Sequence, residues 1–216
     1  MVKWASENGC PLPEDLITIC AYHGYFEMLK WAREKGLDWD DETFTASIES
    51  GDLTLMTWLK DNGCPWGNCT CAVAAQHGDR KSLAWLRSHG CPWGDTFYAS
   101  GVFRGCVDVL KWAMANGCPR DSSDALPCFA ATKANKWEML IWLRENGFPW
   151  DERVCAAAAS NRRLDILRWA REHGCPWNAS VYQAASRARR SSEEVLRYLR
   201  ENGCPMEESG PPHEDS

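Results

Sequence analysis

Apolar and polar positions between residues 147 and 173 predict a pair of helices. The second helix is expected over 164–172, where apolar residues recur at helical spacing: Leu164, Ile166, Leu167, Trp169 and Ala170. Small apolar residues at 154–159 predict a shorter helix before it. Gly147-Phe-Pro-Trp150 separates this pair from the preceding residues, because glycine is favoured just past a helix C-terminus and proline cannot continue a helix. The stretch therefore predicts a helix-turn-helix unit.

The same pattern recurs along nearly the whole chain. Trp58-Leu-Lys-Asp-Asn-Gly-Cys-Pro-Trp66, Trp85-Leu-Arg-Ser-His-Gly-Cys-Pro-Trp93 and Trp169-Ala-Arg-Glu-His-Gly-Cys-Pro-Trp177 are near copies of one segment. The full set of repeat glycines is Gly9, Gly36, Gly63, Gly90, Gly117, Gly147, Gly174 and Gly203. The steps between them are 27, 27, 27, 27, 30, 27 and 29 residues, and a nearly constant period in this range is typical of a repeat array.

Two positions of the repeat unit predict how neighbouring units pack. The second helices share a large apolar position, occupied by Leu29, Met56, Leu83, Leu110, Leu140, Leu167 and Leu196. The first helices share a small one, occupied by Cys20, Ser47, Ala74, Gly101, Ala131, Ala158 and Ala185. Small residues let helices approach closely, and the large residues then fill the layer between units.

The repeat therefore predicts an all-α solenoid of stacked helix-turn-helix units, in which each unit contacts mainly its neighbours. We expect one array over residues 1–206, made of a half-unit at 1–9 and six units of about 27 residues. Residues 1–10 match the second half of a unit, so we expect the chain to be a fragment of a longer array. Ser192 is expected to cap a helix, and the acidic residues 207–216 predict a disordered tail.

Tryptophan and cysteine are abundant, with 13 and 12 copies, but most of them follow the repeat. The tryptophans therefore indicate packing, and stacking platforms for bases or sugars are the alternative. Six cysteines directly follow a repeat glycine: Cys10, Cys64, Cys91, Cys118, Cys175 and Cys204. Equivalent positions in stacked helices lie roughly 8–10 Å apart, whereas a disulfide needs Cα atoms about 4.4–6.8 Å apart. Reduced thiols are therefore expected.

Charge and motifs argue against several classes of function. The net charge of −6 argues against nucleic-acid binding, which favours a basic surface. No run of about 18 apolar residues and no N-terminal signal segment occurs, so we expect a cytoplasmic or nuclear protein without a membrane span. The five histidines are scattered and no phosphate-binding loop is present, so neither catalysis nor a cofactor is expected. Cys69 and Cys71 with His77 are the candidate zinc ligands, but a fourth ligand is not evident.

Three segments resemble parts of the ankyrin repeat. Residues Leu164–Gly174 resemble its second helix and glycine, Leu126–Ala131 its Thr-Pro-Leu-His-x-Ala start, and Tyr22–Glu27 its inter-helix turn. The resemblance covers about residues 1–206. The unit here has 27 residues against about 33 in ankyrin, and the missing residues fall where ankyrin forms its β-hairpin finger. The chain is thus similar to short-unit ankyrin-like repeats that contain Gly-Cys-Pro-Trp. This resemblance implies absent or shortened hairpins and a contact surface on the inner helical face.

Residues outside the repeated core are expected to select the partner. They lie at the end of the first helix and in the turn after it: Tyr22, His23, Tyr25, Glu49, Asp52, His77, Asp79, Arg104, Lys133, Lys136, Arg162, Arg163 and Arg187. Their character changes from aromatic through acidic to basic. Residues 1–90 likewise hold 8 basic and 13 acidic side chains, whereas residues 91–203 hold 16 and 13.

We therefore predict a monomeric, non-catalytic scaffold that binds another protein through this face. Three alternatives remain open at this point. The face could consist only of solvated helix ends, the protein could depend on thiols or zinc, or the basic C-terminal units could bind nucleic acid.

Overall fold

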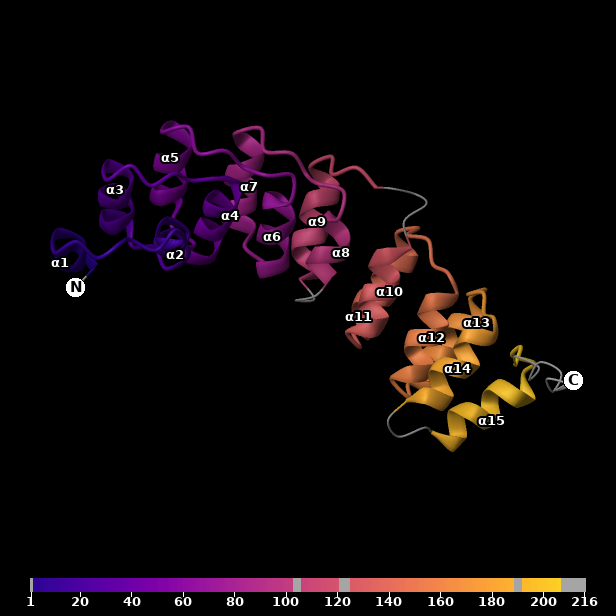
Figure 1. Ribbon diagram of the computed structural model, residues 1–216. Helices are drawn as coiled ribbons and strands as arrows, with labels where there is room; N and C mark the ends of the chain where they lie inside the picture. The colour runs from indigo at the N-terminus through magenta and orange to yellow at the C-terminus, as the bar shows by residue number, and fades with distance from the viewer. Residues whose placement is uncertain (1, 103–105, 121–124, 189–191, 207–216) are drawn as a thin grey trace, which may run out of the picture. The chain divides into compact units, whose positions relative to one another are not determined.

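The computed structural model describes residues 2–102, 106–120, 125–188 and 192–206. Within these ranges the chain forms fifteen α-helices and no strand, so the predicted all-α class is confirmed (Figure 1). Arg104 of the predicted face and the predicted tail, 207–216, lie outside the described residues. Between each repeat glycine and the next first helix, the described chain contains no β-hairpin.

Helix α1 (Val2–Glu7) corresponds to the predicted half-unit, and helix pairs follow it. The first helices of the pairs are α2 (Leu16–Tyr22), α4 (Asp41–Ser50), α6 (Thr70–His77), α8 (Phe97–Val102), α10 (Leu126–Lys133), α12 (Glu152–Ser160) and α14 (Ala179–Arg187). The second helices are α3 (Phe26–Glu34), α5 (Leu53–Asp61), α7 (Arg80–Ser88), α9 (Val107–Ala115), α11 (Trp137–Glu145), α13 (Leu164–Glu172) and α15 (Glu193–Glu201).

The described residues thus contain seven helix pairs after α1, and the six predicted from the sequence are one too few. Eight repeat glycines bound seven intervals, and every interval holds a first and a second helix. The extra residues of the two longer intervals leave both helices of those pairs in place.

Two compact blocks divide the chain: an N-terminal block, Met1–Pro119, and a C-terminal block, Arg120–Ser216. In the N-terminal block, α2 packs on α4, α4 on α6, and α6 on α8, and each also packs on the second helix of its own pair. In the C-terminal block, α10 packs on α12 and α12 on α14, again with their own second helices. Each block is therefore a stack of helix pairs with contacts between sequence neighbours.

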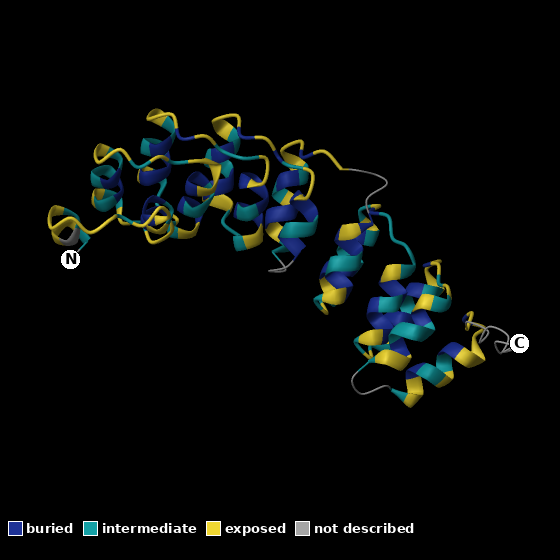
Figure 2. Cartoon of the chain, in the orientation of Figure 1, coloured by how far each residue is buried: buried dark blue, intermediate teal, exposed yellow. Residues whose placement is uncertain are grey.

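The core of each block follows the two predicted positions (Figure 2). The large apolar residues from Leu29 to Leu167 are fully buried, and only Leu196 is half-buried. All seven small residues of the first helices are buried as well. At Gly101, an added Cβ would lie 2.5 Å from Cδ2 of Leu110, so even a methyl group is excluded there. Small side chains therefore set the close approach of the stacked helices.

Five of the turns that follow second helices contain a tryptophan, which we call the turn tryptophan. A lysine or arginine side chain of the preceding second helix lies over the ring of each one. The paired side chains are Arg33 with Trp39, Lys60 with Trp66, Arg87 with Trp93, Arg144 with Trp150, and Arg171 with Trp177, at 3.5–4.4 Å between the cationic group and the ring centroid. All four arginines also donate to a backbone carbonyl of the turn, as Arg171 Nη1 does to Cys175 at 2.6 Å. These tryptophans have structural partners, which supports packing over a role as stacking platforms.

Most of the turn tryptophans also contact an aromatic ring of the next pair along the chain. Trp39 meets Trp58 edge-on at 5.6 Å between ring centroids, and Trp150 meets Trp169 in the same way at 5.5 Å. Where Arg120 replaces the turn tryptophan, the cation two residues after Trp112 is replaced by Met114. The cation and the tryptophan are therefore absent together at that turn.

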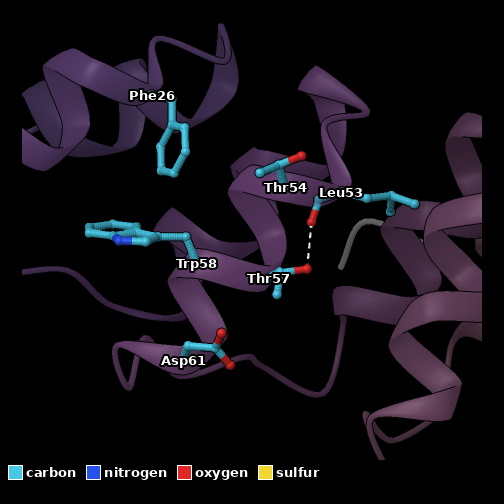
Figure 3. Close-up of a pocket in the computed structure, with 6 residues that line it drawn as sticks. All are labelled: Phe26, Leu53, Thr54, Thr57, Trp58 and Asp61. Atoms are coloured by element: carbon cyan, nitrogen blue, oxygen red, sulfur yellow. Dashed lines mark hydrogen bonds between the residues drawn. The ribbon is translucent and has the colours of Figure 1, made fainter.

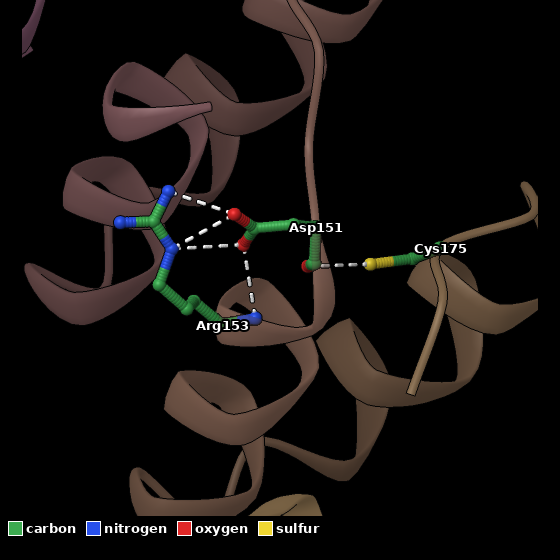
Figure 4. A network of polar contacts seen from close by, with 3 residues as sticks. All are labelled: Asp151, Arg153 and Cys175. Carbon is green, nitrogen blue, oxygen red and sulfur yellow. Dashed lines mark hydrogen bonds and ion pairs between the residues drawn. The ribbon is translucent and has the colours of Figure 1, made fainter. Parts of the chain in front are cut away.

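The buried turn cysteines connect neighbouring pairs. The Sγ atom of Cys175 donates to the carbonyl of Asp151 at 3.3 Å, while the Asp151 carboxylate accepts the backbone N–H of Arg153 at 3.0 Å (Figure 4). Cys64 Sγ donates in the same way to Asp40 at 3.4 Å. Asp40 and Asp151 are the N-cap residues of α4 and α12, so each thiol holds the start of a first helix. None of the twelve cysteines, all of which lie in the described ranges, forms a disulfide.

Candidate interaction face

The predicted face residues occupy two structural positions. Tyr22, His77, Lys133 and Arg187 are the last residues of first helices, and Glu49 is next to last. Tyr25, Asp52, Asp79, Lys136 and Arg163 are the N-cap residues of second helices. His23 and Arg162 lie in the turns between the two sets.

Within each block, these turns contact one another. In the N-terminal block, a Cβ added to Gly24 would lie 3.3 Å from Cβ of Ser50, which places the first turn against the second. In the C-terminal block, the side-chain amide of Asn161 donates to the carbonyls of Thr132 and Lys133 at 2.9 and 3.2 Å. The predicted residues therefore line one edge of the stack in each block.

An aromatic cluster occupies this edge at the first pair. Tyr22 and Tyr25 are 47% and 58% exposed, and the His23 ring lies between theirs, with centroids 5.0 Å from Tyr22 and 5.4 Å from Tyr25. Ile19, one helical turn earlier, is 42% exposed and adds an aliphatic side chain. The sequence prediction omitted Ile19. Its spacing of three residues from Tyr22 would have placed it on the same helix face.

The acidic residues at the next two pairs have partners of their own. Glu49 Oε1 lies 2.8 Å from Nε2 of His77, which joins α4 to α6. One carboxylate oxygen of Asp52 accepts the backbone N–H groups of Thr54 and Leu55 at 2.8 and 3.3 Å. Asp79 caps α7 in the same way. Helix capping thus explains part of what the sequence assigned to partner binding at Asp52 and Asp79.

The basic character of the C-terminal block is weaker on this edge than the sequence suggests. Arg163 forms a two-pronged pair with Asp165, with Nε to Oδ1 at 2.9 Å and Nη2 to Oδ2 at 2.6 Å, and it also donates to Asn135. This pairing lowers the pKa of Asp165 and raises that of Arg163. Lys133, Arg162 and Arg187 are exposed and, together with half-buried Lys136, carry the remaining positive charge of the predicted residues in this block.

Two turns on this edge use left-handed backbone without glycine. Gly24, Gly51 and Gly78 have φ of 69°, 64° and 71°, and Asn135 and Arg162 take the same conformation with φ of 57° and 59°. Asparagine tolerates this region, but arginine does so only at a steric cost.

Another predicted feature, a cap by Ser192, is wrong in part: Ser192 is the N-cap residue of α15, but its hydroxyl makes no capping hydrogen bond.

A hollow of about 430 Å³ lies on the second helices α3 and α5, and its lining begins next to Tyr25 and Asp52 (Figure 3). Its lining consists of Phe26, Leu53, Thr54, Thr57, Trp58 and Asp61. The Thr57 hydroxyl already donates to the carbonyl of Leu53 at 2.7 Å, and Asp61 is the one ionisable residue of the lining. This lining therefore supplies no paired nucleophile and base.

The candidate zinc ligands do not converge. Cys69 is an exposed residue at the start of α6, Cys71 is fully buried, and His77 at the other end of α6 pairs with Glu49. Among the described residues, no group of three or more His, Cys, Asp or Glu side chains gathers as a metal site. None of the helices in the same ranges is both long and apolar enough to cross a membrane.

Comparison with known proteins adds little beyond the architecture. Neither a family model nor a curated protein sequence matches this chain. Among solved structures, the crystal structure of the pentatricopeptide repeat protein PPR10 from maize matches with a TM-score of 0.46 and 15% sequence identity. The match covers 94% of this chain but 37% of that one, so the chain spans little more than a third of its length. The helix pairs themselves establish the conclusion that the chain is a helical repeat protein.

Proposed function

We propose that this chain is a non-catalytic scaffold of the ankyrin-like type that binds another protein through the edge formed by the first-helix ends and the turns after them. The observation that carries the proposal is a contrast between positions within the repeat. The core positions stay either large and apolar or small along the array, whereas the last position of the first helix changes from Tyr22 to Lys133 to Arg187. Side chains that vary on a constant frame are how repeat proteins select partners.

The ankyrin-like assignment rests on the three segments that resemble ankyrin, and the recurring Gly-Cys-Pro-Trp turn supports the short-unit type. A first helix with small buried residues, a left-handed turn and an amphipathic second helix agree with the resemblance seen in the sequence. A single array over residues 1–206 and a monomeric state are part of this proposal.

The helices that carry the proposed face favour binding, because their contacts hold them in place in the absence of a partner. Asp52 and Asp79 fix the starts of α5 and α7, and the Glu49–His77 pair joins neighbouring first helices. A surface that is already ordered loses less conformational entropy on association, so a larger share of the contact energy remains for affinity. Nucleic-acid binding has weaker support, because the charge of Arg163 is compensated by Asp165.

Affinity capture from a cell lysate tests the proposal. The bait is the whole chain, and it is compared with a face variant that carries Tyr22→Ser, Tyr25→Ser, Asp52→Asn, Lys133→Ser and Arg187→Ser. Asparagine keeps the N-cap at position 52, because it caps helices as well as aspartate does. A matched control carries five exposed substitutions on second helices: Glu34→Ser, Lys81→Ser, Lys111→Ser, Glu138→Ser and Glu201→Ser.

We expect at least one protein to be retained by the wild type and the control and to fall by roughly tenfold or more on the face variant, as when central interface side chains are removed. Equal helicity of the three baits by circular dichroism excludes unfolding as the cause. If all three baits retain the same proteins in the same amounts, this edge does not bind a partner.

A further inference from the structure

The N-terminal block displays an unusual concentration of exposed apolar side chains. In the described residues, six large hydrophobic side chains are exposed, and three of them, Ile19, Tyr22 and Tyr25, belong to α2 and the turn after it. Both tyrosines contact the His23 ring, so the three rings form a continuous surface that is open to solvent. The equivalent positions in the next pair are Ala46, Glu49 and Asp52, which gives this surface an acidic neighbour instead of an apolar one.

The aromatic and acidic parts lie side by side. Helices α2 and α4 pack together, and the hydroxyls of Thr18 and Thr43 are 3.0 Å apart. At the other end of these helices, the Gly24 turn contacts Ser50, which lies between Glu49 and Asp52 in the sequence. We call the five residues Ile19, Tyr22, Tyr25, Glu49 and Asp52 the aromatic-acidic patch.

The charge around this patch is negative. Residues 1–119 hold 10 basic and 15 acidic side chains. Within the patch, one carboxylate oxygen of Asp52 accepts the hydrogen bonds that cap α5, and Glu49 Oε1 lies 2.8 Å from Nε2 of His77. Its charged residues are thus both acids, and an approaching acidic segment would be repelled by the block as a whole.

We propose that the aromatic-acidic patch binds a basic segment of another protein, with arginine or lysine side chains placed over the tyrosine rings and against the two carboxylates. This inference rests on the proposed function and names the chemistry of the partner. Aromatic faces attract guanidinium and ammonium groups through the ring quadrupole. Charge-assisted hydrogen bonds to carboxylates add strength and direction. Ile19 contacts the aliphatic part of such an arginine or lysine side chain. The methylene groups of that side chain are then buried, while its charged group remains hydrated.

Selection from a displayed library of random 12-residue peptides tests the inference without a known partner. The wild-type chain is the bait, and each selected peptide is then synthesised and measured against defined variants. The aromatic variant is Tyr22→Ser with Tyr25→Ser. The acidic variant is Glu49→Gln with Asp52→Asn, which keeps hydrogen-bonding groups at both positions. The matched control is Asp151→Asn with Glu152→Gln, which removes the same two charges at the start of α12 in the C-terminal block.

We expect the selected peptides to be enriched in arginine and lysine relative to the starting library. Their Kd should rise roughly two- to fivefold for each tyrosine removed, should rise in the acidic variant, and should stay unchanged in the control. It should also rise with salt concentration, because exposed charges are screened. Replacing each arginine of a peptide by citrulline, which has the same shape and no charge, should abolish the effect of the acidic variant.

Several outcomes overturn the inference. These are a selection that yields no enriched peptide, selected peptides that are acidic or uncharged, and basic peptides that bind the aromatic and acidic variants as well as the wild type. The proposed function fails on a different result, namely lysate capture that is the same for the wild type, the face variant and the control. If capture is lost with Lys133→Ser and Arg187→Ser alone, the proposed function holds, but the aromatic-acidic patch is not the binding site.

Discussion

Each helix pair has two turns, and they differ in what they do. The turn after the second helix repeats its buried cysteine and its tryptophan-cation contact in most pairs, and its side chains point to neighbouring pairs. The turn after the first helix repeats only its left-handed residue, and its neighbours change in size and charge. The comparison separates side chains that hold the array together from side chains that are available to a partner.

The largest effect expected from this comparison is at Trp93, the most buried of the turn tryptophans, at 8% exposure. Trp93→Ala removes contacts to Phe97 and Trp112 and the ring under Arg87, and should lower the free energy of unfolding by about 3 kcal/mol. Urea unfolding followed by circular dichroism measures it. Tyr25→Ala, on the other turn, should change it by less than about 0.5 kcal/mol. Equal losses of unfolding free energy in the two variants would show that the two turns contribute equally to stability, contrary to this prediction.

The buried turn thiols predict a loss of stability at high pH. Burial raises the pKa of Cys64 to about 12 and that of Cys118 to about 11, above the value of an exposed thiol. Unfolding therefore releases protons above pH 9, and the stability that is present below pH 9 decreases as the pH rises towards the folded pKa. Each of these thiols should cost about 1.4 kcal/mol between pH 8 and pH 10.

Urea unfolding at the two pH values tests this prediction. In Cys64→Ala the stability at pH 8 is lower, but the difference between pH 8 and pH 10 should shrink by the share of one thiol. Exposed Cys10 is the control, and Cys10→Ala should leave the difference unchanged. A pH dependence that is the same in Cys64→Ala and the wild type would contradict the assignment.

The smallest effect is at Arg162, in one of the turns of the proposed interaction face. Arg162→Gly should raise the free energy of unfolding by about 0.5 kcal/mol, because the relief of the left-handed strain exceeds the entropy that glycine gains in the unfolded chain. Asn135→Gly is the matched control and should have little or no effect. If Arg162→Gly is more stable but binds a partner less tightly than the wild type, the residue at this turn favours binding at the expense of stability.

The repeat made the core predictable. Leu83 and Ala158 could be placed in the interior from spacing alone, because a helix that stacks on identical neighbours must bury the same positions each time. The cation over each turn tryptophan could also have been inferred, since Met114 and Arg120 replace both partners of one such contact together. The predicted number of six pairs was wrong, because the eight repeat glycines bound seven intervals and each interval holds a complete pair.

The candidate face was less predictable, because its properties depend on contacts between pairs. Nothing in the sequence around Glu49 shows that His77 lies 2.8 Å away, since that contact depends on how α4 packs on α6. The pairing of Arg163 with Asp165 needed side-chain geometry as well, because a spacing of two residues at a helix start permits several orientations. The charge counted along the sequence therefore overestimated the basic character of this edge in the C-terminal block.

The short reach of the contacts between pairs has a consequence for how the chain folds. Cys64 bonds to a residue 24 positions earlier, Thr18 to one 25 positions later, and Asn161 to one 29 positions earlier. These three side-chain hydrogen bonds span 24 to 29 positions, which is about the length of one repeat unit. Chains with such local contacts fold quickly, since little loop-closure entropy is lost before a contact forms. Folding can thus begin at any pair and extend to its neighbours, so one damaged turn would leave the pairs on either side able to nucleate independently.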